Sequence, residues 1–246
     1  MRNLVGNLSK PIMDVLKMNR TSFLFFMCVL SLLSLGTVSV LEAKEQGLKN
    51  EPSSKFAKLD SHSLKESVEA HFLTVVSNID TTLLSNKTQL KSSDVALADF
   101  VNSNLLPLWN SDRTLKLLIG KKRWNNLNQE NISSLNQIFD QTMHRYVAEG
   151  MKFYDSQRLS LSSVKLNEEG TKGILTVEIE PVYLPSFKIN FKISRQANQW
   201  FLYDILVEGI SYVKMKKNEY RGIISEKGID ELLSYLENKN LTTKED

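Results

Sequence analysis

The stretch from Asn198 to Gly222 constrains the fold of this chain most, because it reads as a buried strand that ends in a bend. From Trp200 to Val207, apolar residues occupy both sets of alternating positions. A strand has this composition when protein covers both of its faces. Gly209 then allows a bend or a bulge, and the segment beyond it is expected to be basic and exposed. Three lysines form this first basic cluster: Lys214, Lys216 and Lys217.

Asp204 and Glu208 interrupt the apolar run at a spacing of four residues. The two-residue period of a strand places both on the same face, and either would need a partner if it were buried. The sequence places no histidine, arginine or nucleophile beside them. We therefore expect a structural role for the pair, in which turn amides or a basic side chain satisfy the carboxylates, rather than acid–base catalysis.

Three further segments alternate with a period of two and precede this strand, at residues 159–164, 174–179 and 187–193. Turns are predicted at Glu169-Gly170 and at residues 196–199. Four consecutive strands with short connections predict an antiparallel meander. Five apolar side chains are expected on its helix-facing side: Val177, Ile179, Phe187, Ile189 and Phe191.

Apolar residues spaced by three and four predict helices over residues 64–84, from about residue 92 to 101, and over 131–154 and 228–241. Ser63 and Glu66 have the spacing of a capping box for the first of these helices. Pro107 breaks the second pattern, and a short helix ends at Gly120. Helices, then strands, then a closing helix predict an α+β fold in one domain, with a four-stranded antiparallel sheet.

The N-terminal region is predicted to direct export. Residues 1–20 carry four basic side chains, whereas residues 22–41 carry no charge. This order fits a secretory signal, although roughly 20 apolar residues can also span a bilayer. Residues 1–43 are therefore predicted to be a signal peptide or an N-terminal anchor, 44–63 a flexible linker, 64–241 the folded domain and 242–246 a tail.

Composition and motifs favour a binding protein over an enzyme. The 31 basic and 28 acidic residues leave a net charge of +3, which is too small to indicate nucleic-acid binding. Cys28 is the only cysteine and lies in the apolar N-terminal run, so the rest of the chain has neither a disulfide framework nor a thiolate metal site. The motifs of serine hydrolases, zinc proteases, P-loop NTPases and dinucleotide-binding enzymes are absent. We therefore expect no cofactor and no metal.

Two segments carry a family resemblance. The pattern W-x-x-Y-D-x-x-V-E-G-I-S-x-V, from Trp200 to Val213, resembles the signature of the MlaC-type periplasmic phospholipid-binding proteins, also known as toluene-tolerance or organic-solvent-resistance factors. A second similar run contains a proline, an L-x-L-G-like segment and an aromatic residue. Five positions of this chain match it: Pro107, Leu117, Ile119, Gly120 and Trp124. Asn110 stands where the family usually has an aspartate.

The resemblance implies a twisted antiparallel sheet packed on helices around a deep apolar lipid cavity. It also implies a periplasmic carrier that shuttles phospholipid between an outer-membrane lipoprotein–porin complex and an inner-membrane ABC transporter complex with its lipid-binding subunit. Such traffic would maintain the lipid asymmetry of the outer membrane. A ligand-free periplasmic interaction module, or a small enzyme that uses Asp204 as a base, are the alternatives.

Candidate lipid-binding residues come from the helices and from the sheet, and helix 131–154 is expected to face the sheet across the cavity. They are Leu105, Trp109, Phe139, Met143, Tyr146, Val147, Val177, Ile179, Phe187, Ile189, Phe191 and Tyr203. The basic cluster after the bend is a candidate surface for docking to partner proteins. A second cluster has the same predicted role: Lys121, Lys122 and Arg123.

Overall fold

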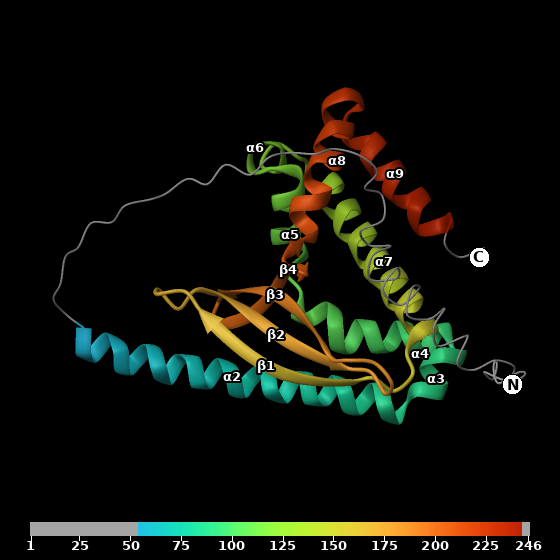
Figure 1. The fold of residues 1–246 in the computed structure, drawn as a ribbon. Helices are drawn as coiled ribbons and strands as arrows, with labels where there is room; N and C mark the ends of the chain where they lie inside the picture. Colours follow the sequence, from blue (N-terminus) through green and yellow to red (C-terminus); the bar gives the residue numbers. More distant parts are fainter. Residues whose placement is uncertain (1–53, 243–246) are drawn as a thin grey trace, which may run out of the picture. The chain divides into compact units, whose positions relative to one another are not determined.

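The computed structural model describes residues 54–242, in which helices precede and follow one antiparallel sheet (Figure 1). The helices before the sheet are α2 (Ser54–Ser85), α3 (Lys87–Ser92), α4 (Asp94–Phe100), α5 (Ser111–Ile119), α6 (Lys121–Trp124) and α7 (Gln129–Phe153). A π-helical turn, η1 (Val101–Leu105), and a 3-10 turn, η2 (Leu106–Leu108), join α4 to α5. The helices after the sheet are α8 (Tyr212–Lys227) and α9 (Ile229–Thr242). The predicted α+β class is therefore confirmed.

The sheet is an antiparallel meander in which each strand pairs with the next along the chain. It contains β1 (Arg158–Leu166), β2 (Lys172–Glu180), β3 (Phe187–Gln196), β4 (Gln199–Val207) and β5 (Ile210–Ser211). The prediction of four strands is wrong by this last short strand. Glu208 and Gly209 have φ angles of 51° and 80°, and this tight turn folds β5 back onto Leu206 and Val207.

The turns within the meander explain its register. Ala197 and Asn198 alone connect β3 to β4 and have φ angles of 46° and 64°, which is the conformation of a two-residue I′ hairpin. Gly170, with a φ of 61°, lies in the connection between β1 and β2. Both turns lie where the sequence predicts them.

Helix α2 begins at Ser54 rather than after Ser63. The predicted capping box is therefore wrong, because Ser63 lies inside the helix. The segment around it is rich in lysine, leucine and alanine, which favour helix, so residues 54–63 of the predicted linker are helical. The rest of that linker, the predicted signal segment and the last four residues lie outside the described residues.

Helix α8 corrects a second expectation, since the lysine-rich segment after Gly209 forms a helix that is exposed only in part. Ser211 caps the helix by accepting a hydrogen bond from the Lys214 amide at 3.0 Å. Val213 and Tyr220 are buried on one face of the helix. This face packs against α5 and α9, so packing overrides the polar composition of the segment.

Gly120 and Arg221 join α5 to α8. Gly120 ends α5 with a φ of 100°, which a residue with a side chain rarely adopts. A Cβ at this position would lie 2.9 Å from Nη2 of Arg221. The Arg221 guanidinium donates to the carbonyls of Leu118 and Leu117, at 3.0 and 3.1 Å, and so satisfies the last turn of α5.

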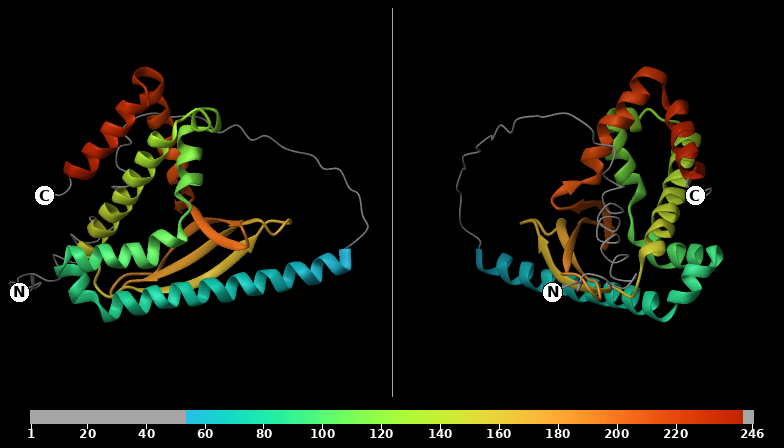
Figure 2. Two further views of the ribbon diagram at one scale, coloured as in Figure 1. Left: turned by 180° about the vertical axis from the view of Figure 1, so that it is seen from behind. Right: turned by 45° about the vertical axis from the view of Figure 1, so that its right-hand side comes forward.

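Three hydrophobic clusters hold these elements together. In the first, Val68, Phe72 and Val76 of α2 pack on the sheet, and Figure 1 shows α2 running along it. The second cluster joins α5, α6, α7, α8 and α9. The third joins α3, α4, η1 and the end of α7. Residues of α7 belong to both the second cluster and the third, and Figure 2 shows the course of this helix from two further sides.

No helix among residues 54–242 is both long and apolar enough to cross a membrane.

Candidate functional site

Asp204 fixes the junction between β4 and α8. Its side chain is 2% exposed and accepts hydrogen bonds from Lys192 Nζ at 2.8 Å, Ser211 Oγ at 2.6 Å and the Val213 amide at 3.1 Å. Glu208 is exposed in the turn that follows. The carboxylate of Asp204 thus has both the basic partner and the turn amide expected for a structural role.

Thr114 holds α5 against β4 at Tyr203, the residue before Asp204. Its hydroxyl donates to the Tyr203 carbonyl at 2.7 Å and accepts from Trp109 Nε1 at 2.9 Å. Arg113 lies over the Tyr203 ring, with 4.3 Å from its guanidinium carbon to the ring centroid. Asn110 caps α5 by accepting from the Arg113 amide at 2.8 Å. Because aspartate and asparagine are both favourable N-caps, the departure from the family pattern at residue 110 preserves the local structure.

The apolar face of the sheet packs against α2. Val177 and Leu175 are buried beside Phe72 of α2, and Phe191 is half-buried against the same cluster. The expectation that helix 131–154 faces this surface is therefore wrong for Val177. The physical reason is that α2 carries its own stripe of large apolar residues over the length of the sheet, which competes for the same face.

Helix α7 carries a different apolar stripe, and protein covers it only in part. Met143, Tyr146 and Val147 recur at helical spacing, and every residue from Thr142 to Gly150 is half-buried. Leu105 of η1 and Val147 contact the same buried cluster. Met143 packs against the cluster that joins α5 to α9. We name the set of four residues the α7 stripe: Leu105, Met143, Tyr146 and Val147.

Aromatic pairs bound the α7 stripe. The rings of Trp109 and Phe139 have centroids 6.2 Å apart. The rings of Tyr146 and Tyr212 meet edge to face at 6.4 Å. Burial raises the pKa of Tyr212 well above its ordinary value, and the neighbouring phenols of Tyr220 and Tyr146 raise it further. The phenol of Tyr212 is therefore neutral at physiological pH, and it adds no charge to this end of the stripe.

Burial divides the twelve predicted lipid-binding residues into three groups. Four are buried in the protein: Phe139, Val177, Ile189 and Tyr203. Seven are half-buried: Leu105, Trp109, Met143, Tyr146, Val147, Ile179 and Phe191. Phe187 is exposed. Because a ligand needs accessible surface, the half-buried residues are the better candidates, and those on or beside α7 lie close together.

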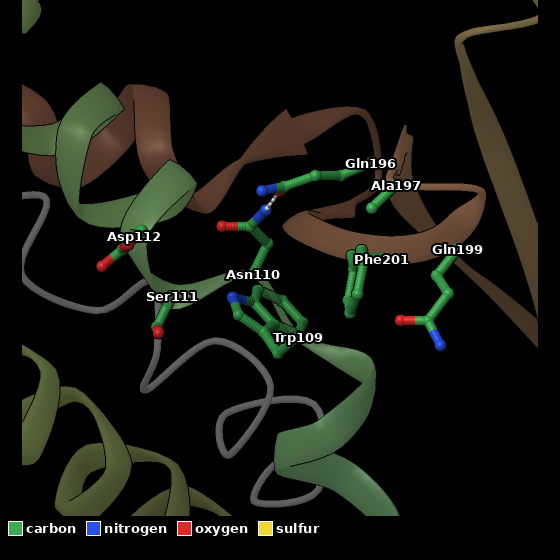
Figure 3. A pocket seen from close by; sticks show the side chains of 8 residues that line it. All are labelled: Trp109, Asn110, Ser111, Asp112, Gln196, Ala197, Gln199 and Phe201. Carbon is green, nitrogen blue, oxygen red and sulfur yellow. Dashed lines mark hydrogen bonds between the residues drawn. The ribbon is translucent and has the colours of Figure 1, made fainter.

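An open pocket of about 270 Å³ lies between the start of α5 and the turn from β3 to β4. Figure 3 shows Trp109 and Phe201 with Asn110, whose amide donates to Gln196 Oε1 at 2.6 Å. Among the predicted residues, only Trp109 lines it. The volume lies below the 300–1,000 Å³ typical of ligand pockets, so this pocket alone does not accommodate a phospholipid.

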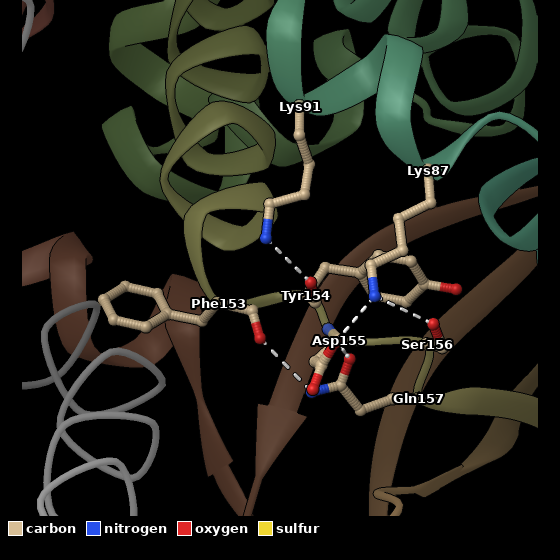
Figure 4. Close-up of polar contacts among 7 residues, drawn as sticks. All are labelled: Lys87, Lys91, Phe153, Tyr154, Asp155, Ser156 and Gln157. Atoms are coloured by element: carbon tan, nitrogen blue, oxygen red, sulfur yellow. Dashed lines mark hydrogen bonds and ion pairs between the residues drawn. The ribbon is translucent and has the colours of Figure 1, made fainter. Parts of the chain in front are cut away.

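A polar network fixes the end of α7 to α3 and to the start of β1 (Figure 4). Lys87 Nζ lies 2.6 Å from the Asp155 carboxylate and 3.0 Å from Ser156 Oγ. The hydrogen bond and the charge of Lys87 lower the pKa of Asp155. Lys91 donates to the Tyr154 carbonyl at 3.1 Å. This network holds the C-terminal end of α7, which follows the stripe, in place.

A second polar network, centred on Glu219, joins α8 to α9. Glu219 accepts from Lys216 Nζ at 2.8 Å, from Lys239 Nζ at 3.2 Å and from the Tyr235 hydroxyl. Burial opposes ionisation of Glu219, but these donors outweigh it and lower its pKa to about 2. We call these four residues the Glu219 clamp.

The clamp changes the interpretation of the basic clusters. The side chain of Lys216 is only 12% exposed and paired, whereas Lys214 is exposed and Lys217 half-buried. In α6, Lys121 and Lys122 are exposed, while Arg123 donates to Ser225 Oγ of α8 at 2.5 Å. The structure therefore leaves Lys121, Lys122 and Lys214 most accessible to a partner.

Sequence reasoning overlooked five residues that join the elements around the site: Thr114, Tyr212, Glu219, Arg221 and Asn240. Asn240 is buried, accepts from Arg145 Nε at 3.1 Å and donates to the Ile138 carbonyl at 3.3 Å, which ties α9 to α7. A signal for α8 exists in the sequence, because Ser211, Val213, Tyr220 and Gly228 have the spacing of an N-cap, an apolar face and a C-terminal glycine.

Comparisons with known proteins agree with this architecture. The family model described as MlaC protein matches residues 74–238. The solved structure of a phospholipid-binding protein from Ralstonia solanacearum, in complex with a phospholipid, superposes with a TM-score of 0.64 at 17% sequence identity. The match covers 72% of this chain and 98% of that one. No curated protein matches the sequence. Because the family model spans more than half of the chain, this protein belongs to the MlaC family.

Proposed function

We propose that this protein binds a phospholipid and carries it, with the α7 stripe in contact with the acyl chains. The observation that carries the proposal is the half-burial of four clustered apolar side chains in a protein of the MlaC family. The similar structure from Ralstonia solanacearum is itself that of a phospholipid-binding protein in complex with a phospholipid. Acyl chains would gain ~0.8 kcal/mol for each buried CH₂ group.

Transport by such a carrier requires no nucleophile or general base. Asp204, the one carboxylate considered as a base, is already occupied by Lys192, Ser211 and an amide. Many buried CH₂ groups would make spontaneous release slow, so a partner must open or compete for the site. This requirement favours a binding and transport protein over an enzyme.

The carrier would work in the periplasm, between the outer-membrane lipoprotein–porin complex and the inner-membrane ABC transporter complex with its lipid-binding subunit. Membership of the MlaC family supports this place of action, and the charge-free segment at residues 22–41 supports export. Lys121, Lys122 and Lys214 would provide the contact with acidic partner surfaces, because they are exposed and such contacts steer brief, salt-sensitive encounters.

The proposal is tested by filling the α7 stripe. Val147→Trp should exclude phospholipid and cost little stability, because the side chain at this position is half-buried. Val177→Trp is the matched control, since Val177 is buried under α2 and overpacking there should cost about 1–3 kcal/mol without removing the ligand. Lipid extracted from each purified protein, together with urea unfolding, measures both effects. An unchanged phospholipid content in Val147→Trp would contradict the proposal, and a protein without lipid would favour a ligand-free interaction module.

A further inference from the structure

The connection between β2 and β3 exposes large apolar side chains at adjacent positions. Val182 is 59% exposed and Tyr183 is 77% exposed. Other strongly exposed apolar side chains of the described region, such as Leu73 in α2 and Val95 in α4, belong to separate helices. Scattered exposed apolar residues are ordinary, whereas adjacent ones on one loop indicate an interaction site.

The loop carries no charge from Pro181 to Phe187. The loop is fixed at its base, where Ile179 pairs with Phe187 across the two strands and Ser186 Oγ donates to Glu178 Oε1 at 2.6 Å. Two prolines, Pro181 and Pro185, lack the amide hydrogen that an added strand would need. The loop is therefore suited to apolar contact rather than to pairing with another strand.

Basic residues around the loop are already paired with acids. Arg158 Nη2 lies 2.8 Å from the Asp80 carboxylate, and Lys188 Nζ lies 3.9 Å from Glu178. A binding surface that depended on charge would need uncompensated basic residues. Contact at this loop should therefore depend on apolar insertion, with little sensitivity to salt.

The opposite end of the sheet has the contrary character. Consecutive turns of a meander alternate between the two ends, so the β1–β2 and β3–β4 turns lie together, away from the β2–β3 loop (Figure 1). Those turns contain Asn167, Glu168, Glu169, Gly170 and Thr171, and Ala197 and Asn198. The β1–β2 and β3–β4 turns thus make their end of the sheet polar, whereas the β2–β3 loop itself is apolar.

We propose that the β2–β3 loop inserts Val182 and Tyr183 into the interfacial region of a phospholipid bilayer. Tyrosine favours this region because its ring is apolar and its hydroxyl remains hydrated. Two side chains on a loop supply only weak and reversible attachment. The inference stands on the exposed loop itself and does not require that the protein also carry a lipid in the α7 stripe.

An environment-sensitive fluorophore tests this contact. Val182→Cys, in the full chain with Cys28→Ser, retains Tyr183 and places the fluorophore at the tip. The matched control is Glu169→Cys, in the turn at the polar end of the sheet. On addition of phosphatidylcholine vesicles, the label at 182 should shift to shorter wavelength and be quenched by nitroxide-labelled lipid, at low and high salt, whereas the label at 169 should not.

A label at position 182 that remains in water, or that is quenched no more than the label at 169, would overturn the inference. A partner protein would then be the molecule that contacts the loop. The double variant Val182→Ser/Tyr183→Ser separates this result from the proposed function. It should lose bilayer contact and retain its co-purifying phospholipid. A wild-type protein without phospholipid but with a quenched label at 182 would contradict the proposed function alone.

Discussion

Asp204 joins β3, β4 and α8 through a single buried carboxylate. Asp204→Ala would leave the Val213 amide and the Ser211 hydroxyl without their acceptor, and Lys192 without its counterion. Because the Lys192 side chain is 33% exposed and can reach water, the expected loss of unfolding free energy is about 2–4 kcal/mol. Urea denaturation measures it.

Glu208→Ala is the matched control for that measurement, since Glu208 belongs to the same predicted pair but is exposed. Its effect should stay within about 0.5 kcal/mol. Equal losses in both variants would show that Asp204 does not organise the junction.

At the scale of single residues, the sequence predicts the kind of partner that Asp204 has, but not which residue supplies it. The apolar surroundings of Asp204 require a basic group or an amide. Its pairing with Lys192 depends on strand register, which shifts between Lys192 and Ile193. A shift of this kind moves every later pair, and local composition does not reveal it.

The Glu219 clamp gives α8 and α9 a predictable response to acid. A carboxyl group whose pKa is lowered by folding, here from 4.5 to about 2, stabilises the protein above its unfolded pKa. That contribution is lost as pH falls from 4.5 towards 2. We expect the melting temperature of wild type to fall more steeply over this range than that of Glu219→Gln.

Circular dichroism melts across the same range make the comparison, with Glu226→Gln as control because Glu226 is exposed on the same helix. Parallel curves for wild type and Glu219→Gln would contradict a stabilising role for the ionised clamp.

At the scale of elements, the sequence predicts which periodic segments form helices and strands. It does not predict which helix covers which face of the sheet. The apolar alternation of β1 to β3, the continuous apolar run of β4 and the stripe of α7 appear directly in the sequence, and all of these elements are present. The polar composition of residues 214–219 conceals α8, whose buried face rests on Val213 and Tyr220. Likewise, the sequence shows that Val177 faces a helix but not that α2, rather than α7, covers it.

Across the whole molecule, the exposed lysines are expected to set the rate of docking. Charge reversal at Lys121, Lys122 and Lys214 should leave the bound phospholipid unchanged but slow its transfer to acceptor complexes at low salt, because like charges weaken steering. Lys216 is left intact, since reversing it would also disrupt the Glu219 clamp. Transfer from donor to acceptor is followed with fluorescent phospholipid.

Arg123→Gln provides the control, because Arg123 already contacts Ser225 of α8 and should contribute little to docking. Equal transfer rates for wild type and the triple variant at low salt would remove these lysines from the mechanism.

Native mass spectrometry of the purified protein tests the central claim most directly, because it weighs the protein together with whatever it binds. A carrier with acyl chains on the α7 stripe should show, beside the mass of the protein, species heavier by the mass of one phospholipid. These species should be absent from Val147→Trp and present in Val177→Trp. A wild-type protein that shows only its own mass after gentle purification would contradict the account.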